Sequence, residues 1–409
     1  MPKTKKDEEL VEEARVGGVI VQLVDTLVKQ AMLNKASDIH IEPDQDKMRV
    51  RFRIDGILHE IGSHAISLLP SLVSRIKVLA NLDISERRHP QDGRFQMMVG
   101  DTQVDFRIST FPTISGENVV MRLLDKGQII LGLEELGMNP RDLEKLNNFI
   151  HRLYGLVLVT GPNGSGKTTT LYSSINIINS IDKSIATLED PVEYQLPLVR
   201  QTQVDPEARL SFAEGLRSLL RQDPDIIMVG EVRDRDTAGI AVQSALTGHL
   251  VLSTLHTNDA VGAVTRLIDM GIEPVLMAAA TIGVIAQRLV RTICPNCIEQ
   301  YTISAETATS MDIPKDATLY RGRGCGQCND TGYKGRTGIF EVLTIDDTVR
   351  PLLIAKAPAE RIINAARKQG MRSLREDGLE KALAGITTIE EVIRVTEARH
   401  PVEQDVERV

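Results

Sequence analysis

The feature that most constrains this chain is a glycine-rich segment between an apolar run at residues 156–159 and a helix-like stretch at residues 169–178. Its residues are Gly161, Pro162, Asn163, Gly164, Ser165, Gly166, Lys167 and Thr168, followed by Thr169. This spacing is typical of a phosphate-binding loop between a strand and a helix. Glycines let backbone N–H groups turn toward one anion, and the helix N-terminus adds partial positive charge there. The sequence therefore predicts a nucleoside triphosphate site, with Lys167 on the β- and γ-phosphates and Thr168 on Mg²⁺.

Size and charge narrow the class of protein. At 409 residues the chain is long enough for about two or three domains. A formal net charge of −8 argues against a dedicated nucleic-acid binder, while leaving room for local basic patches. No apolar run approaches the length of a membrane span, and residues 1–13 are charged, unlike a signal peptide. We therefore expect a cytoplasmic protein that reaches any membrane through partners.

Periodicity predicts a first domain of mixed α and β structure at residues 19–125, after a charged segment at residues 1–18. Its expected elements are helices at residues 19–35 and 67–80, strands at residues 48–54, 104–109 and 119–124, and a turn at Asp55-Gly56. In the first strand, apolar side chains alternate with Arg49, Arg51 and Arg53, which we expect to form a solvated cationic face. Glycines punctuate residues 126–138, which are expected to be a linker.

From residue 139 to residue 290, buried strand patterns alternate with helical ones. The expected strands are residues 156–160, 184–188, 226–229 and 249–253, and the expected helices include residues 211–220 and 237–246. Such alternation is typical of a parallel sheet covered by helices on both faces. A cysteine-containing module at residues 291–340 and a mostly helical region at residues 341–409 follow. The predicted fold class is therefore α/β.

The strand at residues 226–229 is followed by Gly230 and Glu231. Triphosphate hydrolysis needs a carboxylate beside Mg²⁺ and the attacking water. The segment resembles a Walker B motif in which glycine replaces the usual aspartate, so Glu231 is the carboxylate at the strand end. The alternative is a buried strand with a solvent-exposed glutamate at its exit. The phosphate loop upstream favours the catalytic interpretation.

Two further blocks carry groups suited to nucleotide chemistry. Glu189, Asp190 and Glu193 follow the strand at residues 184–188 and could bind the waters of Mg²⁺ or polarise the nucleophilic water, although Asp190-Pro191 could equally mark a simple acidic turn. His249 begins the strand expected at residues 249–253 and His256 follows it, and both could sense the γ-phosphate by hydrogen bonding. A lone histidine would more often be a satisfied core residue, and the presence of two favours function.

The cysteines occur as two Cys-x-x-Cys pairs, Cys294 with Cys297 and Cys325 with Cys328. Four thiolates from two such pairs suit a tetrahedral, closed and structural Zn²⁺ site. The alternative is a redox pair, which two pairs in a cytosolic chain make less favourable.

Together these blocks resemble the secretion ATPase superfamily of type II secretion and type IV pilus assembly, the GspE/PilB group. The resemblance covers residues 23–373 and includes residues 36–43, 90–94 and 221–231. It implies a RecA-like P-loop core, a PAS-like N-terminal domain, and Mg²⁺-dependent ATP hydrolysis by a homo-hexamer. It also implies structural Zn²⁺ and a platform protein of the inner membrane as the partner, with pilin or pseudopilin assembly as the work done.

The resemblance further implies roles for individual residues. Arg94, Arg107 and Arg122 match positions at which family members place arginines against the nucleotide of a neighbouring site. Glu231 and Glu193 become the candidates for orienting water and metal. The family usually carries an additional N-terminal docking domain, so we expect either a truncated chain or another way of recruiting the partner. A nucleic-acid-translocating ATPase is the alternative, against which stand the acidic charge and the lack of aromatic residues among basic ones.

Overall fold

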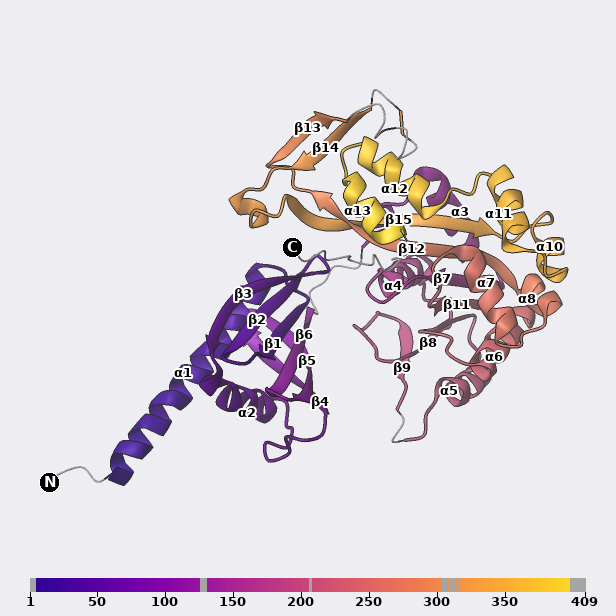
Figure 1. Ribbon diagram of the computed structural model, residues 1–409. Helices are drawn as coiled ribbons and strands as arrows, with labels where there is room; N and C mark the ends of the chain where they lie inside the picture. Colours follow the sequence, from indigo (N-terminus) through magenta and orange to yellow (C-terminus); the bar gives the residue numbers. More distant parts are fainter. Residues whose placement is uncertain are drawn as a thin grey trace. The chain divides into compact units, whose positions relative to one another are not determined.

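The computed structural model describes residues 5–125, 131–205, 208–303, 308, 313–314 and 317–397, with side chains from residue 17 onward and not at residues 124–125 (Figure 1). It divides into two compact units, Met1–Ile129 and Ile130–Val409. Part of the predicted linker, residues 126–130, lies outside the described residues. The rest packs in the second unit, because Leu133, Leu136 and Met138 are buried in its core.

The first unit holds a six-stranded antiparallel sheet in the order β3-β2-β1-β6-β5-β4. The strands are β1 (Asp38–Pro43), β2 (Lys47–Ile54), β3 (Ile57–Ala65), β4 (Gln91–Val99), β5 (Thr102–Thr113) and β6 (Gly116–Asp125), and the helices are α1 (Lys5–Leu33) and α2 (Leu69–Leu79), the latter after a 3₁₀ turn at Ile66–Leu68. Apolar side chains of both helices share one core with one face of the sheet. The α+β prediction is confirmed, but α1 begins well before residue 19, and β1, β3 and β4 were not predicted.

Strand β2 shows why this sheet forms. Met48, Val50 and Phe52 are fully buried, whereas the alternating arginines point to the other face. Asp55 and Gly56 have φ angles of 48° and 86°, the positive values that a tight two-residue hairpin requires. The predicted strand and turn are both confirmed.

The second unit is built on a seven-stranded sheet in the order β15-β12-β7-β11-β10-β8-β9. The strands are β7 (Gly155–Thr160), β8 (Ile185–Glu189), β9 (Val199–Gln203), β10 (Ile226–Val229), β11 (Leu250–Leu255), β12 (Thr281–Ile293) and β15 (Tyr333–Thr344). Helices α3 (Pro140–Ile150), α4 (Lys167–Ile178), α5 (Phe212–Leu219), α6 (Arg235–Leu246), α7 (Ala260–Asp269) and α8 (Pro274–Ala280) pack around it. Two separate apolar clusters involve the sheet and different helices, which confirms a core covered on both faces.

Strand β15 corrects the predicted organisation of this unit. It pairs antiparallel with β12 along nearly its whole length, and the two lie side by side in Figure 1. Residues 333–344 therefore belong to the core sheet, although the sequence pattern placed them in the cysteine module and the helical region. Ile339, Phe340 and Val342 are fully buried there, because β15 has an apolar cluster on each side.

The four-cysteine region contains a two-stranded ribbon of β13 (Ile298–Thr302) and β14 (Thr318–Gly322). The predicted helical C-terminal region is confirmed as α10 (Arg350–Ile354), α11 (Ala359–Lys368), α12 (Leu374–Leu383) and α13 (Ile389–Thr396). Among the residues that the structure describes, no helix has the length and apolarity needed to span a bilayer.

Helix α13 is tied to β12 by Glu391, whose side chain is almost fully buried. Glu391 accepts hydrogen bonds from the Arg291 backbone N–H at 3.0 Å and from Arg291 Nη2 at 2.8 Å, and its other partner is Arg394. Burial alone would raise the pKa of Glu391, but these donors outweigh it and lower the pKa to about 2. The ionised carboxylate is therefore a fixed anchor for the C-terminal helices.

We expect Glu391→Gln to reduce the free energy of unfolding by about 3 kcal/mol at pH 7, because it leaves Arg291 without its buried anion. The folded pKa lies below the ordinary 4.5, so the stabilisation is present above pH 4.5 and is lost as the pH falls toward 2. Denaturant unfolding of both proteins across this range measures the difference. A gap between them that does not close on acidification would contradict this account of the anchor.

Candidate active site

The phosphate loop lies between the carboxyl end of β7 and the first turn of α4, as predicted. Gly164 and Gly166 have φ angles of 74° and 88°, which residues with a side chain rarely adopt. A Cβ on Gly166 would also lie 2.7 Å from Gln287 Nε2. Both glycines are thus required by the backbone path that carries Lys167 and Thr168 to the start of α4.

Lys167 is almost buried, and its ammonium contacts the loop itself. Nζ donates to the carbonyl oxygens of Gly161 at 2.8 Å and Pro162 at 3.0 Å. Burial lowers the pKa of Lys167 to about 8; Glu231 opposes this shift and Arg288 adds to it. A triphosphate would supply the negative charge that this buried cation lacks. Thr168 is exposed in the first turn of α4, where its hydroxyl can reach a metal bound to that phosphate.

We expect ATP to bind more weakly as the pH rises through about 8, because only the ammonium form of Lys167 attracts phosphate. Bound phosphate raises the pKa again, so binding above pH 8 should take up a proton. Isothermal titration in buffers of different ionisation enthalpy measures both the affinity for ATP and the number of protons taken up on binding. Equal affinity at pH 7 and pH 9 with no proton uptake would contradict the assigned environment of Lys167.

Three side chains from separate segments meet beside the loop. His256, directly after β11, places Nδ1 3.5 Å from Lys167 Nζ and Nε2 3.3 Å from Glu231 Oε2. An ammonium can only donate, so this arrangement fits the tautomer in which Nδ1 accepts and Nε2–H donates to Glu231. The phosphate-binding cation and the carboxylate after β10 are therefore joined through one histidine.

His249 does not lie with these three side chains in the structure, and its predicted role in sensing the γ-phosphate stays a prediction. In the parallel pairing of β11 with β7, Leu250 lies opposite Gly155 and Leu255 opposite Thr160. His249 therefore lies at the opposite edge of the sheet from the phosphate loop, with Nδ1 3.0 Å from the Ser244 carbonyl oxygen.

The acidic residues at the end of β8 and after it, Glu189, Asp190 and Glu193, lie in different surroundings. Glu189 is buried and accepts hydrogen bonds from Thr187 Oγ1 at 2.5 Å, from Gln201 Nε2 at 3.1 Å and from the Tyr172 hydroxyl. The last residue of β8 thus points inward in this structure, and the predicted role of Glu189 in binding the waters of Mg²⁺ or polarising the nucleophilic water stays a prediction. Asp190 is exposed, with Oδ2 3.5 Å from Arg233 Nη1.

Glu193 follows in the same loop and is half-buried. Its backbone N–H donates to the Tyr172 hydroxyl at 3.3 Å, which packs the loop against α4. Its proposed role in orienting water or metal stays a prediction.

Two residues under the loop were not predicted. Gln287 and Arg288 lie on β12; Gln287 Oε1 accepts from Thr170 Oγ1 at 2.7 Å, and Arg288 Nη2 donates to the Asn258 carbonyl at 2.9 Å. Both are buried, and burial lowers the pKa of Arg288. A polar pair within the apolar run of residues 281–290 is the signal that could have identified them.

The four cysteines form one cluster. Their Sγ atoms are separated by 3.9 Å (Cys294 to Cys325), 3.8 Å (Cys297 to Cys328) and 3.7 Å (Cys325 to Cys328). A tetrahedral zinc with Zn–S bonds of about 2.3 Å separates its sulfurs by about 3.8 Å. Backbone N–H groups of Cys325 and Gly332 lie 3.3 Å from Cys328 Sγ, where they favour the thiolate. The predicted grouping is confirmed, and its chemistry fits Zn²⁺.

In the first unit, arginines form a row across the sheet. Arg94 lies opposite Arg107, Arg107 opposite Arg122, and Arg122 opposite Asp38. Arg122 Nε donates to the buried carboxylate of Asp38 at 2.9 Å, while its side chain stays 61% exposed. The row thus places three arginines opposite one another on neighbouring strands, an arrangement of like charges that does not by itself stabilise a sheet.

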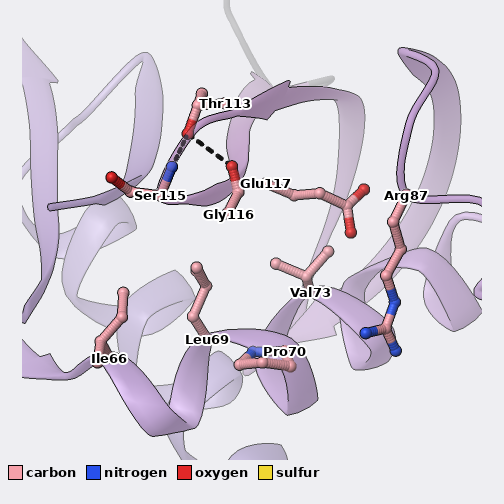
Figure 2. A pocket seen from close by; sticks show the side chains of 9 residues that line it. All are labelled: Ile66, Leu69, Pro70, Val73, Arg87, Thr113, Ser115, Gly116 and Glu117. Atoms are coloured by element: carbon pink, nitrogen blue, oxygen red, sulfur yellow. Dashed lines mark hydrogen bonds between the residues drawn. The ribbon is translucent and has the colours of Figure 1, made fainter. Parts of the chain in front are cut away.

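A separate cavity of about 210 Å³ lies between α2 and the β5–β6 hairpin. Figure 2 shows Leu69, Pro70 and Val73 on its helical side, with Arg87 and Glu117 together at one end. Its lining is mostly apolar, which does not suit a triphosphate, and we assign it no ligand.

Known proteins resemble this chain over most of its length. Residues 13–394 match the family described as type II/IV secretion system protein. The chain is 52% identical over 379 residues to the type II secretion system protein E of Dickeya dadantii, covering 92% of this chain and 76% of that protein. It is 49% identical to the type IV pilus assembly ATPase PilB of Thermus thermophilus, over 92% of this chain and 43% of that protein.

Among solved structures, the chain resembles the pilus retraction motor PilT with bound ADP. The TM-score is 0.62 with 26% identity, covering 92% of this chain and 97% of that one. The match spans both units, and the phosphate loop, Glu231 and His256 lie within the residues matched by the family. This chain therefore belongs to the type II/IV secretion system protein family and is a P-loop ATPase.

Proposed function

We propose that this chain hydrolyses Mg²⁺–ATP as a motor that drives assembly of a type IV pilus or of the type II secretion pseudopilus. The observation that carries the proposal is the meeting of Lys167, His256 and Glu231 beside the phosphate loop. A cation for phosphate and a carboxylate for water are the two groups that hydrolysis needs. The names of the two relatives, a secretion protein E and a pilus assembly ATPase, support the pilus or the pseudopilus as the structure that this motor assembles.

Each residue has a distinct task in this mechanism. The loop's N–H groups and Lys167 bind the phosphates, and Thr168 with Asp190 would hold Mg²⁺, which neutralises charge on the β- and γ-oxygens. Glu231 orients the attacking water and is itself oriented by the Nε2–H of His256. Glu193, in the loop after β8, is proposed as a further carboxylate for orienting the water or the metal.

The arginine row completes the site in an assembly. We propose a homo-hexameric ring in which Arg94, Arg107 and Arg122 of one subunit face the nucleotide of its neighbour. Charge that develops on the γ-phosphate then attracts them, so ATP closes the interface and phosphate release opens it. The ring would transmit this motion to a platform protein at the cytoplasmic face of the inner membrane.

Hydrolysis by the purified chain tests the proposal. We expect ATP turnover that requires Mg²⁺, is lost on chelation with EDTA, and is unchanged by added DNA or RNA. Absence of ATP turnover at concentrations where the chain is oligomeric would contradict the enzymatic role, and stimulation by nucleic acid would favour a translocase.

The four-cysteine cluster is proposed to bind one Zn²⁺ as a structural ion. We expect Cys325→Ser to reduce the zinc content and to lower the thermal midpoint of unfolding, because three remaining thiolates bind less tightly. ATP binding at the phosphate loop should persist, since that loop is formed by other segments. Metal analysis of the wild type that finds no zinc would remove this part of the proposal.

A further inference from the structure

Arg233 lies in the loop between β10 and α6, two residues after Glu231, and its guanidinium contacts two carboxylates. Nη2 is paired with Glu231 Oε1, and Nη1 lies 3.5 Å from Asp190 Oδ2. Asp190 and Glu231 follow neighbouring parallel strands, β8 and β10, on the nucleotide side of the sheet. One side chain therefore links the two strand ends that supply carboxylates to the site.

The two oxygens of Glu231 have different partners. Oε1 pairs with Arg233, and Oε2 lies 3.3 Å from His256 Nε2. A carboxylate with donors on both oxygens cannot rotate without losing one of them. The Glu231 side chain is only 16% exposed, so solvent does not readily replace either donor.

A guanidinium suits this position better than an ammonium would. Its N–H groups are fixed in a plane, so one arginine can direct separate donors to two acceptors at a defined angle. A group that orients a reacting water must be held within about 10–20° of its working direction. The contacts of Arg233 supply that restraint without reaching the phosphate loop.

We propose that Arg233 is a positioning residue for ATP hydrolysis, which holds the Glu231 carboxylate in one orientation and is steadied by Asp190. The inference rests on the role proposed for Glu231. The competing explanation is a surface ion pair, since the Arg233 side chain is 59% exposed and exposed pairs usually contribute little. Kinetics separate the two, because a surface pair has no effect on turnover.

The test compares Arg233→Gln with Arg217→Gln in the 409-residue chain. Arg217 is a matched control, because it is 53% exposed and also pairs with an aspartate, Asp236, at 3.8 Å. We expect Arg233→Gln to lower kcat by about 10- to 100-fold, the cost of a misdirected catalytic group, with KM for ATP unchanged within about twofold. Arg217→Gln should retain wild-type kcat. Arg233→Lys should recover part of the activity, because it can hold one carboxylate.

A double-mutant cycle identifies the route of the effect. If Arg233 acts through Glu231, the Glu231→Gln/Arg233→Gln variant will be no slower than Glu231→Gln alone. Wild-type kcat in Arg233→Gln, or an equal further loss in the double variant, would overturn the inference. Wild-type turnover in Glu231→Gln would instead overturn the proposed role of Glu231, and the inference with it. Thermal unfolding of each variant confirms that the proteins compared are folded.

Discussion

Lys167→Ala is expected to abolish measurable ATP hydrolysis, with kcat/KM reduced by about 10²- to 10³-fold or more. The ammonium is held inside the phosphate loop by its contacts with the carbonyls of Gly161 and Pro162. Alanine leaves the backbone cradle but removes the charge that meets the β- and γ-phosphates. Steady-state phosphate release measures the loss of hydrolysis, and titration with nucleotide measures the loss of binding.

Lys368→Ala is the matched control, since that lysine is exposed at the end of α11. It should turn over ATP at the wild-type rate. Normal turnover in Lys167→Ala, with the protein folded and oligomeric, would show that the phosphate loop is not the site of hydrolysis.

Arg122→Ala is expected to lower kcat by about 10³-fold, as loss of an arginine that stabilises transferring phosphate does in other ATPases and GTPases. Its Nε is held by the buried Asp38, which leaves the outer N–H groups of an exposed side chain to meet an anion. ATP affinity should change little, because Lys167 and the loop supply ground-state binding. The rate at saturating ATP is therefore the measurement that isolates this residue.

Arg49→Ala serves as the control for the arginine row. Arg49 lies on the same face of the same sheet but pairs with Asp44 at 3.7 Å and is not part of the row. Wild-type kcat in Arg122→Ala would mean that Arg122 does not contribute to hydrolysis, and an equal loss in Arg49→Ala would mean that the arginines act only through general charge.

Local patterns predicted the elements whose residues repeat regularly. The phosphate loop, the strand before it and β10 follow from apolar runs and glycine spacing, and the alternation in β2 and β5 identified the first sheet. The cysteine cluster followed from two short motifs. What these have in common is that a few adjacent residues determine the conformation.

The missed features depend on pairing between distant segments. β15 belongs to the core sheet because it pairs with β12, and the sequence of residues 333–344 alone does not predict that pairing. The separation of His249 from the phosphate loop follows from strand direction, and the inward position of Glu189 follows from its buried partners Thr187 and Gln201. No sequence pattern predicts a role for Arg233, because its two carboxylate partners come together only in the folded sheet.

The most direct test of the shared site is to mix two inactive variants, Lys167→Ala and Arg122→Ala, and to measure ATPase activity after the subunits exchange. If each site combines the loop of one subunit with the arginine of another, mixed rings contain intact sites and up to roughly a quarter of wild-type activity returns. Wild-type activity per chain should also fall on dilution to monomers. A mixture that stays inactive although mixed oligomers form, together with full activity of wild-type monomers, would contradict the ring mechanism.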